Sequence, residues 1–347
     1  MYNYSNEIEK FWDEKVRLSK AFKDKLFAHR NANRDRLISR LPTKIEGLTV
    51  NDSSFKPQGS MAMRTIIQTK FSDDEYDIDD GLILNNDELV DDDGNELTTE
   101  EVRDCVLGCL KDDRLVKQPK LFTNCVRVYY SESDKEKHHV DFPIYRSFDN
   151  GEGTIQELAN EEEWTESNPT RINSWFEDQI SSRNAEIDGK GTQLRRLIQL
   201  LKRFVNSRQD WDLPNGLKIT MLATECQDGC FDRIDKAFRE LLIKLKARLE
   251  VSKVIRNLAH PDQPKITRTS SDTNVENFLD KISLALDKLE GLDEEDCDRE
   301  KARRIWDWIF KSDGFFESMT EDSQKMNSFA NKTPSKVVDH RGGGRFG

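Results

Sequence analysis

The sequence has no long apolar run, few histidines and fewer basic than acidic residues, and each shortage argues against a class of protein. No segment is both long and apolar enough to cross a membrane. The first residues, MYNYSNEIEKFWDEK, lack the basic start and apolar run of a secretory signal. We therefore expect a cytoplasmic protein with no membrane partner.

The charge balance is acidic, with 54 Lys and Arg residues against 66 Asp and Glu residues and a formal net charge of −12. A protein that coats nucleic acid by bulk electrostatics needs the opposite balance, so we do not expect nucleic acid as a partner. A local basic pocket for a small phosphorylated ligand remains compatible with this charge. Hydrophobic residues make up 35% of the 347 residues, which is enough for a core in one large domain or two lobes.

The cysteines and histidines form no metal-finger pattern. None of the six cysteines belongs to a CxxC pair, and the five histidines complete no such motif. Cys105 and Cys109, like Cys226 and Cys230, are spaced as residues on one helix face. We interpret the cysteines as reduced cytosolic thiols rather than zinc ligands.

Apolar spacing divides the chain into regions of different secondary structure. Residues 5–40 have a helical pattern, which ends before Pro42. Between about 49 and 147 the segments TIIQT, DIDDGLIL, CVRVYY and HHVDFPIY predict strands, and residues 101–113 predict a helix. After about 155 the chain is mostly helical, most clearly in GTQLRRLIQLLKRFVNSR.

These patterns predict an α+β fold with two lobes. Residues 1–155 would form an N-terminal helix and a lobe with a mixed sheet, and residues 156–311 a helical lobe. Residues 312–347 are polar and glycine-rich towards their end, and we expect a flexible tail there. A cleft between two lobes is a common place for a ligand.

A cluster of carboxylates lies in QGSMAMRTIIQTKFSDDEYDIDDGLIL, residues 58–84. On a strand, Asp77 and Asp79 project to one face and Asp80 to the other. Two adjacent carboxylates repel each other unless they are neutralised, for instance by a hard divalent cation. Asp141 interrupts the apolar pattern of a later strand. If the two strands pair, three carboxylates converge as in a two-metal phosphoryl-transfer site.

Acidic segments also have interpretations other than a catalytic site. A solvated acidic loop is the ordinary explanation of an Asp run, and we assign no function to VDDDGNEL at 90–97. A calcium loop is excluded for DIDDG, because its glycine comes one position too early and no glutamate stands at the twelfth position. Gly59 and Ser60 favour a nucleotide site, because a Gly-Ser turn offers backbone N–H groups and a hydroxyl to phosphates.

The combination QGSMAMRT…YDIDDGLIL…HHVDFPIY resembles the active-site signature of the polymerase-β-like nucleotidyltransferase superfamily. More closely, it resembles the bacterial CD-NTases, relatives of animal cyclic GMP-AMP synthase that make cyclic oligonucleotides in CBASS anti-phage defence. The branch it resembles most contains the cyclic GMP-AMP synthase of Vibrio. The resemblance implies a nucleotidyltransferase lobe and a helical lobe, with the active site in the cleft between them.

The resemblance also assigns roles to particular residues. The metal-binding catalytic triad is matched by Asp77, Asp79 and Asp141, and the loop that grips the donor triphosphate by Gln58, Gly59 and Ser60. Lys202 falls where the family has a phosphate-contacting lysine, although an exposed helix charge is the alternative. Thr220 matches a hydroxyl near the donor, or is a helix cap.

The implied enzyme uses two Mg²⁺ or Mn²⁺ ions, and ATP together with GTP or another NTP, to make a purine-containing cyclic di- or trinucleotide. Cyclisation is implied by the resemblance alone. No His/Cys cluster matches the zinc-binding insert of the animal relatives. Two alternatives remain: a terminal nucleotidyltransferase acting on RNA or protein, and a catalytically inactive nucleotide-binding interaction protein.

The C-terminal sequence DHRGGGRFG resembles the ends of ubiquitin-like proteins. In some CBASS systems, enzymes that resemble ubiquitin-transfer enzymes couple the nucleotidyltransferase through its terminal glycine. Gly347 is therefore a candidate conjugation point, and a disordered terminus is the alternative.

Overall fold

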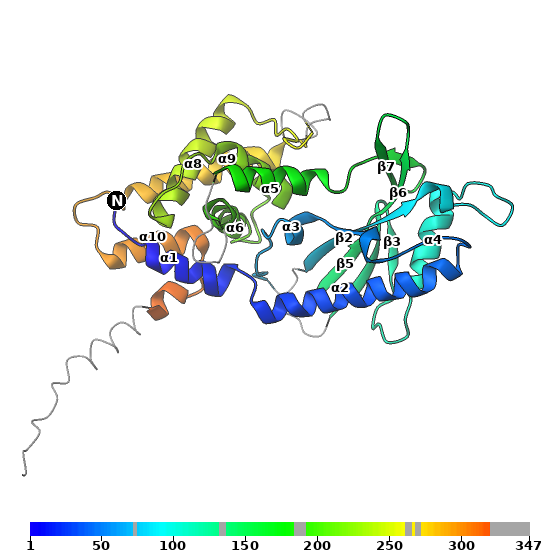
Figure 1. Ribbon diagram of the computed structural model, residues 1–347. Helices are drawn as coiled ribbons and strands as arrows, with labels where there is room; N and C mark the ends of the chain where they lie inside the picture. The colour runs from blue at the N-terminus through cyan, green and yellow to red at the C-terminus, as the bar shows by residue number, and fades with distance from the viewer. Residues whose placement is uncertain (72–74, 132–136, 184–191, 261–265, 268–271, 320–347) are drawn as a thin grey trace, which may run out of the picture.

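The computed structural model describes residues 1–71, 75–131, 137–183, 192–260, 266–267 and 272–319. The strands and helix α2 lie at one end of the molecule, and helices α1, α6, α8, α9 and α10 lie at the other, with α3 between them (Figure 1). Each end has its own cluster of buried hydrophobic residues. The predicted α+β architecture of a sheet lobe and a helical lobe is confirmed.

The predicted N-terminal helix is interrupted. Helix α1 (Ser5–Phe11) continues as the π-helical turn η1 (Trp12–Val16), Arg17 is extended, and α2 spans Lys20–Arg40. The Ser19 side chain caps α2 by accepting from the backbone N–H of Phe22, which favours a new helix start there. The break lets α1 and η1 pack in the helical core while α2 packs on the sheet. This differs from our predicted boundary, which placed residues 1–155 in one lobe.

The sheet lobe is built on eight strands among the described residues. Along the sheet their order is β3-β4-β5-β2-β6-β7-β8, and β1 also pairs with β2. Their bounds are β1 (Phe55–Pro57), β2 (Tyr76–Asn85), β3 (Lys120–Phe122), β4 (Cys125–Tyr130), β5 (His138–Phe142), β6 (Ile144–Asp149), β7 (Thr154–Ala159) and β8 (Trp164–Glu166). Strand β2 runs parallel to both β5 and β6, and the other pairs are antiparallel.

Most of the short apolar segments of the sheet lobe have the predicted secondary structure. The strands predicted for DIDDGLIL, CVRVYY and HHVDFPIY are β2, β4 and β5 with β6, and the helix predicted at 101–113 is α4 (Thr99–Leu110). The strand predicted for TIIQT is wrong, because in that segment only Ile67 forms an isolated bridge, with Arg17. This segment instead lies against α6, whose Gln199 and Lys202 donate hydrogen bonds to its backbone carbonyls.

The helical lobe surrounds one central helix. Its members are α5 (Arg171–Arg183), α6 (Gln193–Val205), α7 (Gly216–Cys226), α8 (Ile234–Val251), α9 (Thr273–Glu290) and α10 (Arg299–Phe310). Every residue of α6 is buried, including its charged ones. A helix buried all round is unusual for a sequence this polar, so its charged side chains need partners inside the protein.

The packed helical core extends past the end of α10. Phe315 is 8% exposed and Phe316 is fully buried, and both rings lie 5.1 to 5.5 Å from the ring of Phe11. We had assigned both residues to a flexible tail beginning at residue 312. The rest of that tail, with Gly347, lies outside the described residues. Among the described helices, none has the length and apolar character needed to span a membrane.

Candidate active site

Two neighbouring strands bring the predicted carboxylates to one face of the sheet. Strands β2 and β5 are parallel, with Asp77 opposite His139 and Asp79 opposite Asp141. The condition for the three carboxylates to converge, pairing of these two strands, is therefore met. Asp77 is exposed and Asp141 is 6% exposed, whereas the intervening Ile78 is 1% exposed and points into the core.

The other face of β2 carries a buried ion pair. Asp80 is fully buried, and its two carboxylate oxygens accept from Nε and Nη2 of Arg34 at 2.6 and 2.5 Å. Arg34 lies on α2, so this pair fastens the helix to the strand that carries Asp77 and Asp79. Bidentate Arg–carboxylate geometry is what a buried carboxylate needs if it is to remain charged.

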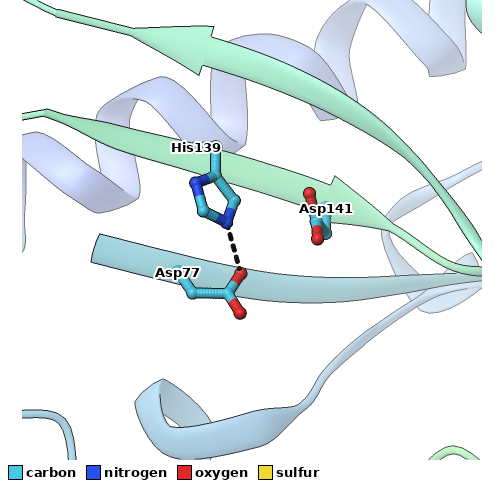
Figure 2. Close-up of side chains that lie close together, drawn as sticks. All are labelled: Asp77, His139 and Asp141. Carbon is cyan, nitrogen blue, oxygen red and sulfur yellow. Dashed lines mark ion pairs between the residues drawn. The ribbon is translucent and has the colours of Figure 1, made fainter. Parts of the chain in front are cut away.

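Asp77, His139 and Asp141 form a cluster with metal-ligand spacing (Figure 2). One donor atom of each residue lies within 4.8 Å of the others. His139 Nε2 is 3.1 Å from Asp77 Oδ1, and His139 Nδ1 is 3.0 Å from Glu75 Oε2. The sequence analysis missed His139, although its position two residues before Asp141 on a strand places it on the same face.

Arg127 of β4 fixes the orientation of Asp141. Its Nε and Nη2 each donate to one carboxylate oxygen at 2.7 Å, from the position directly opposite Asp141 in the antiparallel pair. The hydrogen bonds to Asp141 raise the pKa of Arg127 above its ordinary value. Each carboxylate oxygen keeps a lone pair, so Asp141 can still bind a cation while it pairs with Arg127.

Asp79 lies directly under the predicted phosphate loop. Gly59 has φ +65°, and a Cβ added to it would come 2.0 Å from Asp79 Oδ2. A side chain at residue 59 would therefore strain the backbone and displace the Asp79 carboxylate. Burial, and then the charges of Asp77 and Asp141, raise the pKa of Asp79 to about 7. Carboxylates crowded to this degree fit a divalent cation, which would relieve their repulsion.

The predicted phosphate loop consists of Gln58, which follows β1, and of Gly59 and Ser60, which begin the short helix α3 (Gly59–Ala62). The Gln58 backbone N–H donates to the Asp79 carbonyl at 2.9 Å, and the Ser60 carbonyl accepts from the N–H groups of Thr65 and Ile66. These bonds hold the Gly-Ser turn against the carboxylate strand. The structure therefore places the loop beside Asp79.

Helix α6 holds the segment after this loop through main-chain carbonyls. Arg195 donates to the Met63 carbonyl, and Gln199 to those of Arg64 and Ile66. One turn further on, Lys202 Nζ donates to the Thr65 carbonyl at 3.2 Å and to Thr65 Oγ1 at 2.9 Å. A polar stripe along one side of α6 thus connects the two lobes.

Lys202 is not the exposed helix charge that we considered. It is 6% exposed, and burial lowers its pKa to about 7. Its acceptors on Thr65 are neutral, so nothing in the hydrogen bonds it makes offsets the cost of burying the charge. A buried cation at a cleft is a good partner for an anionic ligand that arrives later.

A cavity of about 530 Å³ lies between the two lobes and is lined by residues of both. Three of the predicted site residues line it: Ser60, Asp77 and Lys202. Lining residues that the sequence analysis missed include Lys70, Arg208 and Trp211. The lining therefore combines two acidic groups, Glu75 and Asp77, with cationic and aromatic groups, and this is the composition expected around a metal–triphosphate ligand.

Arg208 and Trp211 belong to the connection between α6 and α7, where hydrophobic periodicity gave no indication. The Arg208 guanidinium lies 4.4 Å from the Trp211 ring and 4.8 Å from the Trp308 ring. Among the described residues, no carboxylate lies within ion-pair distance of Arg208. Stacking thus holds this cation at the edge of the cavity without neutralising it.

Thr220 does not line the cavity. Its side chain is fully buried, and its hydroxyl donates to the Gly216 carbonyl one turn back along α7 at 2.7 Å. The cap of α7 is Asn215, whose side chain accepts from the N–H of Lys218. Gly216 does line the cavity, so the start of α7 faces the site even though Thr220 does not.

The comparisons with known proteins agree with this geometry. Residues 53–145 match the family described as cyclic GMP-AMP synthase DncV-like, nucleotidyltransferase domain. The chain contains a DncV-like nucleotidyltransferase domain. This domain includes the Gly-Ser loop, strand β2 and the Asp141 strand, whereas Lys202, Arg208 and Trp211 lie outside it.

Solved structures share the fold of both lobes. Vibrio cholerae DncV cyclic AMP-GMP synthase, in complex with nonhydrolyzable GTP, matches with a TM-score of 0.68 and 15% identity over 89% of this chain and 96% of that chain. Bradyrhizobium diazoefficiens CD-NTase CdnG, in complex with GTP, matches with a TM-score of 0.66 and 17% identity over 88% of this chain and 95% of that chain. Escherichia coli DncV in its 3'-deoxy GTP bound form matches with a TM-score of 0.65 and 17% identity over 89% of this chain and 96% of that chain. No curated protein matches the chain in sequence.

Proposed function

We propose that this protein is a CD-NTase that joins nucleoside triphosphates into a cyclic di- or trinucleotide second messenger for anti-phage signalling. The observation that carries the proposal is the cavity between the lobes, which brings Asp77 together with Ser60 and Lys202. The solved structures of similar fold include a cyclic AMP-GMP synthase, which favours a purine-containing cyclic product. ATP, with GTP or another NTP, would be the substrates.

The catalytic role falls to Asp77, Asp79 and Asp141. These residues would hold two Mg²⁺ or Mn²⁺ ions, which lower the pKa of an attacking ribose hydroxyl and stabilise the departing pyrophosphate when bound. Arg127 keeps the Asp141 carboxylate facing the site, and Gly59 leaves room for Asp79. Both arrangements fix the carboxylates before the substrate arrives, so little reorganisation is needed during the reaction.

Binding of the substrate would use groups from both sides of the cavity. The N–H groups at the start of α3 and the Ser60 hydroxyl are placed to donate to the phosphates of the donor nucleotide. Lys202 and Arg208 supply positive charge, and Trp211 presents an aromatic ring on which a base can stack. Thr220 would act indirectly, by holding the first turn of α7 through Gly216.

The test uses purified protein with Mg²⁺ or Mn²⁺ and the four NTPs, followed by phosphatase treatment and mass spectrometry. We expect a phosphatase-resistant oligonucleotide that is absent with the Asp77→Asn/Asp79→Asn double variant. The matched control is Asp92→Asn/Asp93→Asn, which removes two exposed carboxylates from an acidic turn outside the site. An extended RNA or a nucleotide-modified protein as the product would instead identify a terminal transferase. Nucleotide binding without any product would indicate an inactive binding protein.

The C-terminal glycine remains a separate proposal. Gly347 would be the point at which an enzyme resembling a ubiquitin-transfer enzyme attaches the chain to another molecule. Mass spectrometry of conjugates from cells that contain the intact chain or a chain without Gly347 tests this. An unchanged set of conjugates after deletion of the glycine would exclude it.

A further inference from the structure

His139 has a buried nitrogen without a hydrogen-bond partner that faces the carboxylate cluster. Its side chain is 8% exposed. Nε2 comes within 3.1 Å of Asp77 Oδ1 but forms no hydrogen bond of acceptable geometry. A buried polar atom in this state is costly unless something else binds it. Figure 2 shows the ring on β5 turned towards Asp77 of β2, with Asp141 further along the same strand.

The other nitrogen of the ring determines which atom can bind a ligand. Nδ1 lies 3.0 Å from Glu75 Oε2, a distance suited to donation from Nδ1–H to the carboxylate. In that tautomer Nε2 carries a lone pair on the side of Asp77, within the cluster that also contains Asp141. Carboxylate–histidine pairs of this kind orient histidines that bind metal ions.

The neighbouring histidine shows that this arrangement is specific to one position. His138 alternates to the opposite side of β5, where it lies 2.8 Å from His29 and stacks on Tyr130 with ring centroids 5.0 Å apart. Its ring therefore belongs to the packing between α2 and the sheet. The sequence HHVD alone does not distinguish the two roles, and the strand register does.

We propose that His139 Nε2 is a direct ligand of a divalent cation held between Asp77 and Asp141, and that Glu75 orients it. This rests on the cation site of the proposed function and extends it from oxygen ligands to a mixed nitrogen and oxygen set. Mg²⁺ prefers oxygen ligands and water, whereas Mn²⁺ accepts imidazole readily. The site therefore selects Mn²⁺ over Mg²⁺ at this position.

The test needs neither nucleotide nor turnover. Mn²⁺ is added to an excess of the full-length protein, and electron spin echo envelope modulation reports nuclei bound to the ion. We expect nitrogen modulation that shifts when the protein is labelled with [¹⁵N]histidine. The modulation should disappear in His139→Gln and persist in His260→Gln, which alters a histidine outside the cluster. Because Asp77 is exposed, Asp77→Asn is a second variant that tests loss of the ion should His139→Gln not fold.

Three outcomes would overturn the proposal: no saturable Mn²⁺ binding, bound Mn²⁺ without nitrogen modulation, or modulation that survives in His139→Gln. The orienting role of Glu75 predicts that Glu75→Gln keeps the nitrogen modulation but raises the Mn²⁺ dissociation constant about 10- to 100-fold. If Glu75→Gln leaves the constant unchanged, Glu75 has no such role.

The reaction provides an independent measurement. The ratio of product formed with Mn²⁺ to that formed with Mg²⁺ should fall about tenfold in His139→Gln. An unchanged ratio contradicts the proposed selectivity. Nitrogen modulation without any cyclic product would support the His139 ligand and contradict the proposed function. A cyclic product without nitrogen modulation would do the reverse.

Discussion

The two walls of the cavity neutralise their charges in opposite ways. The strand wall is built on β2 and β5, and its Asp77 lines the cavity. Asp141 and, on the opposite face of β2, Asp80 each have a bidentate arginine partner, while burial and neighbouring carboxylates raise the pKa of Asp79 to about 7. On the helix wall, Lys202 donates only to the neutral oxygens of Thr65. The difference shows that each wall keeps one charge poorly compensated, negative on one side and positive on the other. A cation–triphosphate complex would satisfy both.

The largest effect should separate catalysis from binding. Asp141→Asn removes charge where the cation is held, so we expect kcat to fall about 10³-fold. Lys202→Met removes charge from the helix wall, and we expect mainly a KM for NTP raised about tenfold. Steady-state kinetics on both variants makes the comparison. Equal effects of the two variants on kcat would show that the strand wall is not specific for catalysis and the helix wall not specific for substrate binding.

The next effect concerns stability of the strand wall. Arg34→Met leaves the fully buried Asp80 without its partner, and we expect a loss of about 3–5 kcal/mol in the free energy of unfolding. Arg114→Met removes an exposed arginine from Asp112, which keeps Arg36 as a partner, so it should change the free energy of unfolding little. Chemical denaturation measures both. A small loss for Arg34→Met would mean that the sheet tolerates an uncompensated Asp80.

Gly59 of the Gly-Ser loop and Gly94 of an exposed turn form a matched pair of glycines. Gly59 (φ +65°) and Gly94 (φ +83°) both have positive φ, but a Cβ at Gly94 meets nothing within 4 Å. Gly94→Ala should cost about 1–2 kcal/mol through its backbone alone. Gly59→Ala should cost more and lower activity as well, because its Cβ displaces Asp79. Equal losses of stability with full activity in both variants would contradict the close approach.

The helix wall should have its own pH dependence. The folded pKa of Lys202 is about 7, below its ordinary value of 10.5, so between these values the unfolded chain binds a proton that the folded chain does not. The cost of burying Lys202 is therefore greatest below pH 7 and is relieved as pH rises towards 10.5. Relative to Lys202→Met, the wild-type free energy of unfolding should rise across this window. A constant difference in denaturation between pH 6.5 and 9.5 would contradict the buried charge.

The smallest effect is expected at Thr220. Its hydroxyl is bonded within α7, so Thr220→Val should leave the KM for NTP unchanged within about twofold and cost about 1 kcal/mol of stability. The helix-cap variant Asn215→Ala should cost a similar amount. A tenfold rise in KM for Thr220→Val would mean that this hydroxyl reaches the substrate after all.

The sequence predicted the strand wall better than the helix wall, for a physical reason. Side chains on a strand alternate, so the spacing of Asp77 and Asp79 fixed their common face, and Asp141 stood out in an apolar segment. The same rule applied to His139 would have placed it there too. On α6 every residue is buried, so periodicity could not show that Lys202 faces the cavity; the family resemblance did.

Other features depend on conformations that have no periodic pattern. Arg208 and Trp211 lie between helices α6 and α7, and Lys70 directly follows TIIQT, which we predicted to be a strand. The break at Arg17 and the burial of Phe315 and Phe316 follow from packing between distant parts of the chain. Such contacts are set by tertiary structure, and local sequence constrains them weakly.

The bonds from α6 to residues 63–66 have a consequence for how this protein can change during evolution. Within this segment, Arg195 and Gln199 donate to backbone carbonyls, and Lys202 donates to one as well. Every amino acid, proline included, offers that carbonyl. At Met63, Arg64 and Ile66 these bonds are thus independent of the side chain and survive substitution, whereas at Thr65 the hydroxyl also takes part.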